Sequence, residues 1–128
     1  AAKVRSLSLE NHLALATMRS GNGAVDQMSC LMKTVYLAYF LRDTLHADSD
    51  IDAFRLCEAA LEVSAANAQV GRGWTLPDGT DAALATVLAL FDRLLLLITA
   101  HEFDTAWKRL QRFLEGDARS PLPPATPR

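Results

Sequence analysis

The chain has 128 residues, of which 50% are hydrophobic and 22% charged, and its formal net charge is −2. This composition is too apolar for an intrinsically disordered protein and too neutral for a protein that binds nucleic acid through bulk charge alone. Two cysteines cannot build the disulfide framework of a small secreted domain. The length suits one domain, which we expect over residues 1–116, followed by a proline-rich, mobile tail over residues 117–128.

Nothing in the sequence indicates export or a membrane anchor. Residues 1–6 lack the apolar run of a secretory signal peptide. The most apolar stretch, Leu84 to Ile98, is too short to cross a bilayer and contains Asp92 and Arg93, which predicts a buried core helix. Both cysteines lie in apolar helical patterns that are typical of reduced core thiols. We therefore expect a cytoplasmic protein.

The first predicted helix runs from Leu7 or Leu9 to Ser20, with Ser6 or Ser8 as its cap. Alanine and leucine dominate the whole chain and no segment alternates in the manner of a strand, so the other elements are expected to be helices too. Two sides of this first helix are apolar, and we expect it to pack against two neighbours. These sides are formed by Leu9, Leu13 and Ala16, and by Ala14, Leu15 and Met18.

The second predicted helix runs from Gly23 or Ala24 to Leu45 and is apolar on nearly every side, as is typical of the central helix of a bundle. The third runs from Asp50 to Val70, and the short connection before it predicts that the two helices are antiparallel neighbours. Apolar residues recur along the third helix at steps of three and four; they are Ile51, Phe54, Cys57, Leu61, Ala65 and Ala68.

The fourth predicted helix runs from Asp81 to Ile98 with Thr80 as its cap, and it is also apolar almost all round. Thr99 and Glu102 have the spacing of a capping box, which predicts a fifth helix that ends at Glu115. The alternative is one long helix with a kink. The expected buried face of the fifth helix consists of Phe103, Trp107, Leu110 and Leu114. The predicted fold is thus an all-α bundle of four long helices with a shorter or kinked fifth.

The sequence predicts neither catalysis nor a bound cofactor. Asp48, Asp50 and Asp52 alternate as in the first half of a calcium loop, but the loop positions for glycine and for a bidentate glutamate hold Ala53 and Ala59. The histidines lack metal-binding spacing, and no serine lies in a nucleophile motif. We therefore expect a protein that is not an enzyme and that carries no metal or other cofactor.

Two groups of cations are candidates for contact with nucleic acid, because lysine and arginine on helices can bind phosphate. They are Lys108, Arg109 and Arg112 on the fifth predicted helix, and Lys3 and Arg5 near the N-terminus. Three other residues are candidates for contact with a partner or a ligand, namely Trp74 on a glycine-flanked loop, His46 and His101.

Three segments carry a resemblance to known proteins, namely residues 8–15 (SLENHLAL), 34–37 (TVYL) and 106–113 (AWKRLQRF). Together they resemble a group of short proteobacterial proteins, notably from Burkholderia-like bacteria, some of which are labelled Fis-family transcriptional regulators. The resemblance implies a helical protein linked to transcription and supplies no catalytic residue. Of the Fis DNA-binding pattern the chain has Gly21-Asn22, whereas the Leu-Gly-Ile turn and the Arg-x-Thr-Leu recognition helix have no counterpart.

The function expected from the sequence is that of a small helical module that acts by protein–protein contact, with a homodimer as the expected assembly. The reason is that one domain of this length has limited room to bury two helices that are apolar all round. Two alternatives remain open at this point. The cation groups could serve a transcription-associated DNA-binding protein, or the bundle could hold a small ligand.

Overall fold

In the computed structural model, the described residues are 2–20, 24–45, 51–71, 73, 76–77 and 79–122, with side chains described from Leu9 onward except that of Arg19. This part of the chain is all-α and contains no strand. Its helices are α1 (Ala2–Arg19), α2 (Val25–Thr44), α3 (Ile51–Gln69), α4 (Thr80–Leu97) and α5 (Ala100–Glu115). The predicted all-α bundle is confirmed. Within the described residues, no helix is both long enough and apolar enough to cross a membrane.

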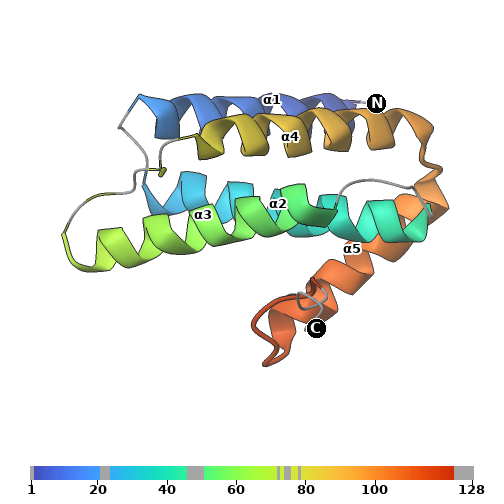
Figure 1. Cartoon of the computed structure of the whole chain (residues 1–128). Helices are drawn as coiled ribbons and strands as arrows, with labels where there is room; N and C mark the ends of the chain where they lie inside the picture. Colours follow the sequence, from blue (N-terminus) through green and yellow to red (C-terminus); the bar gives the residue numbers. More distant parts are fainter. Residues whose placement is uncertain are drawn as a thin grey trace.

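The first four helices lie along one common direction in two layers (Figure 1). One layer is formed by α1 and α4, which run antiparallel, and the other by α2 and α3, which are antiparallel as the short connection predicted. Helix α5 leaves the end of α4 and runs obliquely to the other four. Helix α2 packs against α1, α3, α4 and α5, so it holds the central position expected for it.

The core lies between the two layers and is built around α2. Leu31, Val35 and Leu41 of α2 have no exposed surface. They share one apolar cluster with Phe54 of α3 and Phe91 of α4. Close packing of such side chains accounts for most of the stability of a domain this size, because each fully buried leucine or phenylalanine contributes roughly 1.5–3 kcal/mol.

Both cysteines are free thiols, as predicted. Cys57 is fully buried in α3, and burial raises its pKa from 9.0 to about 12. Cys30 in α2 is only partly buried, and burial together with the charge of Glu10 raises the pKa of its thiol. Neither thiol is therefore activated toward nucleophilic chemistry at neutral pH.

Two of the predicted helix starts are wrong. Helix α1 begins at Ala2, so Ser6 and Ser8 lie inside it and are not caps. The residues before these serines include alanine, lysine and arginine, which favour a helix more than a cap. At α4, Thr80 is the first helical residue and Gly79 is the cap. The backbone of Gly79 has a φ of 83°, and the Thr80 hydroxyl donates to the carbonyl of Pro77, 2.6 Å away.

The boundary between α4 and α5 follows the capping-box prediction, and the alternative of one kinked helix is wrong. Ile98 and Thr99 are extended. Oγ1 of Thr99 accepts from the backbone N–H of Glu102 at 3.1 Å, and Oε1 of Glu102 accepts from the N–H of Thr99 at 2.9 Å. The two side chains satisfy backbone donors that a continuous helix would have used internally, so the chain turns here.

Beyond α5 the chain continues without a helix through residues 116–122. Leu122 packs in the core with only 8% of its surface exposed, and its backbone N–H donates to Oγ of Ser120. The rest of the predicted proline-rich tail, residues 123–128, lies outside the described residues.

Candidate functional site

The outer side of α1 carries leucines that the fold leaves exposed. Leu9 and Leu13 expose 62% and 57% of their surface, and Ala16 is exposed as well. Helix α1 packs against two neighbours, α2 and α4, as predicted. Among the described residues it does so with the opposite side, where Ala14, Leu15 and Met18 are buried. One apolar side of α1 is therefore left without a partner in the monomer.

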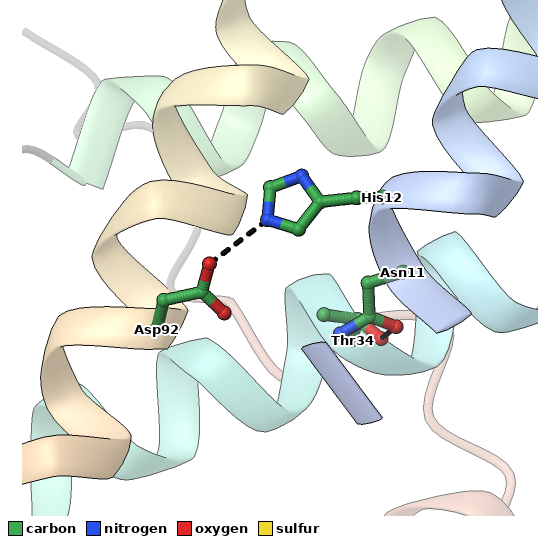
Figure 2. A network of polar contacts seen from close by, with 4 residues as sticks. All are labelled: Asn11, His12, Thr34 and Asp92. Carbon is green, nitrogen blue, oxygen red and sulfur yellow. Dashed lines mark hydrogen bonds and ion pairs between the residues drawn. The ribbon is translucent and has the colours of Figure 1, made fainter. Parts of the chain in front are cut away.

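A side-chain hydrogen bond links α1 to α4. Nε2 of His12 donates to Oδ2 of Asp92 at 2.8 Å, across the seam between the two helices (Figure 2). The two residues are 80 positions apart in the sequence, so no local sequence pattern predicts the contact. The two helices run antiparallel (Figure 1). Counting residues along each helix from the contact between His12 and Asp92 therefore brings Leu9 close to the level of Leu96 and Ala16 close to the level of Ala89.

Across the partly exposed pair of His12 and Asp92, helix α4 carries a second group of exposed apolar residues beside α1. Residues 85, 89 and 96 lie at helical spacing from Asp92 and therefore on the same side of α4, toward α1. Leu96 is 83% exposed, and Leu97 beside it is 73% exposed. We call this surface the α1–α4 face and define it by Leu9, Leu13, Ala16, Ala85, Ala89 and Leu96. Exposed leucines that gather on two adjacent helices are typical of a contact surface.

The predicted cation cluster on α5 is largely engaged in ion pairs within the chain. Nζ of Lys108 lies 2.9 Å from Oδ2 of Asp104, which is four residues earlier and therefore one turn away on the same side of α5. Nη1 of Arg109 donates to Oδ2 of Asp43 at 2.7 Å, and its guanidinium lies over the ring of Phe40. The contacts of Arg109 tie α5 to α2. Together the two ion pairs leave little net positive charge on this surface for a phosphate backbone.

The other candidates from the sequence do not join these cations. Arg112 is exposed and has no ion-pair partner among the described residues. His101 is exposed near the start of α5. Lys3 and Arg5 belong to α1, but their side chains fall outside the described part of the structure. Trp74 and His46, the two remaining candidates for contact with a partner or ligand, also lie outside the described residues.

The apolar face expected for α5 is partly wrong. Leu110 is buried, and Phe103 and Trp107 stack on each other and pack against the core. Leu114 is instead 43% exposed, and Ala106, which the spacing did not single out, is fully buried.

The inner side of α1 carries a buried polar group that the sequence did not reveal. Asn11 is only 2% exposed, and its Oδ1 accepts from the hydroxyl of Thr34 at 2.7 Å (Figure 2). The thiol of Cys30 also donates to this oxygen, at 3.4 Å. Nδ2 of the same amide is buried and has no hydrogen-bond partner among the described residues. An asparagine within an otherwise apolar helix side is the signal that could have drawn attention to it.

Asn11 lines a cavity of about 470 Å³ between α1, α2 and α5, with Phe91 of α4 also reaching its wall. This volume is in the range of small-molecule sites. Nowhere in the described part of the chain, this cavity included, are three histidine, cysteine or carboxylate side chains grouped so that they could hold a metal ion.

Comparisons with known proteins give no further guide to the site, since no family model, no curated protein and no solved structure matches this chain.

Proposed function

We propose that the protein is a helical interaction module that forms a homodimer through the α1–α4 face. The observation that carries the proposal is the exposure of Leu9, Leu13 and Leu96 on two adjacent antiparallel helices. Burying a leucine side chain of this kind stabilises an assembly by roughly 1.5–3 kcal/mol, and each protomer offers several such side chains.

The shape of the α1–α4 face favours a second copy of the chain as the partner. The register set by His12 and Asp92 gives the face a bulky end, with Leu9 beside Leu96, and a small end, with Ala16 beside Ala89. A two-fold axis between these ends places the leucines of one protomer on the alanines of the other. Each leucine pair then fills the space above an alanine pair, and the same contacts occur twice, as in an isologous interface.

The antiparallel arrangement of α1 and α4 also suits such a dimer. In the dimer, the two antiparallel helices of one protomer pack on the two antiparallel helices of the other, which gives the arrangement of a four-helix bundle. Alanines at the small end permit helix axes to approach to about 8–10 Å. The hydrogen bond at the seam gives the Asp92 carboxylate a partner inside each protomer, so the face brings no unpaired carboxylate from that pair into the contact.

The proposal is tested by comparing Leu13→Glu with Leu56→Glu by sedimentation velocity at micromolar concentration. Both leucines are 57% exposed, but Leu56 lies on α3, outside the α1–α4 face. We expect the wild type and Leu56→Glu to sediment as dimers. Leu13→Glu should dissociate the dimer, with a Kd raised at least about tenfold, because it buries an unpaired charge.

Two outcomes would overturn the proposal. A wild-type protein that sediments as a monomer at every concentration would exclude the dimer. A dimer that Leu56→Glu disrupts and Leu13→Glu leaves intact would place the contact on another surface. Circular dichroism of each variant checks that the helices are retained, so that loss of the dimer is separated from loss of the fold.

A further inference from the structure

The cavity between α1, α2 and α5 has an apolar floor. Leu37, Phe91 and Leu110 line it from three different helices, and each is at most 3% exposed. Trp107 adds an aromatic surface. Leu114 also lines the cavity, and its side chain is 43% exposed although its spacing on α5 predicted a buried residue. A pocket with these walls offers the apolar body of a small molecule a surface that the chain itself leaves uncovered.

Two carboxylates belong to the lining of this cavity. Glu10 of α1 and Asp26 of α2 both line it, and both also line a neighbouring cavity of about 220 Å³. Cys30 is the third residue common to the two cavities, so these residues form the wall that the cavities share. Among the described residues neither carboxylate has an ion-pair partner, and Lys33 is the single cation in the lining. The lining therefore carries an excess of negative charge.

The thiol of Cys30 reports the sign of the electrostatic potential at this wall. Burial raises its pKa most, the negative charge of Glu10 raises the pKa further, and the positive charge of Lys33 lowers it by less. The carboxylate thus acts on the thiol more strongly than the ammonium does. Because Asp26 adds a second negative charge to the same wall, the potential there favours a cation and disfavours an anion.

We infer that the cavity between α1, α2 and α5 binds a small organic cation, namely an amine that carries an apolar, preferably aromatic, body. The ammonium group faces the carboxylates of Glu10 and Asp26 and neutralises the negative charge of their wall. The ring packs against Phe91 and Trp107 on the apolar side of the cavity. In the described part of the chain no three carboxylate, thiol or imidazole side chains could hold a metal ion, which favours an organic cation as the occupant.

Three probes of similar shape test the inference, because they differ in charge. They are 2-phenylethylamine, which is a cation at neutral pH, 2-phenylethanol, which is uncharged, and 3-phenylpropanoate, which is an anion. The indole N–H signal of Trp107 is followed by ¹⁵N–¹H NMR and is assigned by its absence in Trp107→Phe. The amine should shift this signal in a saturable way. The alcohol should bind about tenfold more weakly than the amine, and the propanoate more weakly still.

Glu10→Gln and Asp26→Asn remove the charges and keep the shapes of the two side chains. Each should weaken binding of the amine about threefold and the double variant about tenfold, while binding of the alcohol is retained. Glu62→Gln is the matched control, because it removes an equal charge on α3, outside the cavity, and it should bind the amine as the wild type does.

Titration of the wild type alone already decides the case, since absent or non-saturable shifts by the amine overturn the inference. It is also overturned if the alcohol or the propanoate binds as tightly as the amine, or if the double variant keeps the full affinity for the amine. The inference does not depend on the proposed dimer, because none of the six residues that define the α1–α4 face lines this cavity. A monomeric wild type that binds the amine would overturn the dimer alone.

Discussion

Helices α2 and α4 are both apolar around most of their circumference, yet the fold uses them differently. Helix α2 packs against four other helices, and most of its apolar residues are buried. Helix α4 packs against α1, α2 and α3, and its outer side remains open from Ala82 to Leu96. The hydropathy of a helix therefore indicates how much apolar surface it has to bury. Whether that surface is buried within one chain depends on how many other helices pack against it.

The largest expected difference between the two helices is in the cost of shortening a leucine. Leu41 of α2 has no exposed surface, so Leu41→Ala should lower the free energy of unfolding by about 2–5 kcal/mol. Leu96→Ala in α4 should change it by no more than about 0.5 kcal/mol, because no cavity forms. Urea denaturation at a concentration low enough to keep the protein monomeric measures both values.

A control within α4 shows whether the loss in the free energy of unfolding depends on the burial of the leucine or on the helix in which it lies. Leu88 is 1% exposed, and Leu88→Ala should behave like Leu41→Ala. If Leu96→Ala proved as costly as Leu88→Ala in the monomer, the outer side of α4 would have to be covered by the chain itself, and the contrast between the helices would be lost.

The second prediction concerns the interior that α2 shares with α3, where burial keeps ionisable groups protonated. The pKa of Cys57 rises from 9.0 to about 12, and that of Tyr36 rises through burial and its 2.7 Å hydrogen bond to Glu58. The unfolded chain loses these protons at a lower pH than the folded chain does. The contribution of the two groups to the free energy of unfolding is therefore fully present below pH 9 and decreases as the pH rises toward 12.

Each such group contributes a slope of at most about 1.4 kcal/mol per pH unit. Cys57→Ser removes the thiol and keeps its size, so the free energy of unfolding should fall less steeply above about pH 9 than in the wild type. Cys30→Ser, at a partly buried thiol, serves as the comparison and should flatten the profile less. Identical slopes for wild type and Cys57→Ser would contradict the assignment.

The sequence predicts the helices well but the site poorly, for reasons that particular residues make plain. Gly71 and the Thr99 capping box are local signals, and the helix ends beside them are close to the predictions. The pairing of His12 with Asp92 and of Asn11 with Thr34 depends on helices that meet only in the folded chain. The apolar stripe with Leu9 has a core spacing, so only the arrangement of neighbours shows that it stays exposed.

The third prediction concerns the point where α4 stops and α5 begins. Thr99→Ala removes the side-chain oxygen that accepts from the N–H of Glu102, and should lower the free energy of unfolding by about 1 kcal/mol. Thr99→Ser keeps the oxygen and should stay within a few tenths of a kcal/mol of the wild type. Urea denaturation decides, and equal stability of the alanine and serine variants would mean that packing alone ends α4 at Leu97.

The smallest expected effect is that of the bridge between α1 and α4. His12 and Asp92 are each about one-third to one-half exposed, so a double-mutant cycle with His12→Ala and Asp92→Ala should give a coupling of about 0.2–1 kcal/mol. His101→Ala, at an exposed histidine on α5, should show no coupling with Asp92→Ala. A measurable coupling means that α1 and α4 keep one antiparallel register in solution, which holds the leucine and alanine ends of the α1–α4 face in place. A coupling of zero would leave that register, and the shape argument for a second copy as partner, without support.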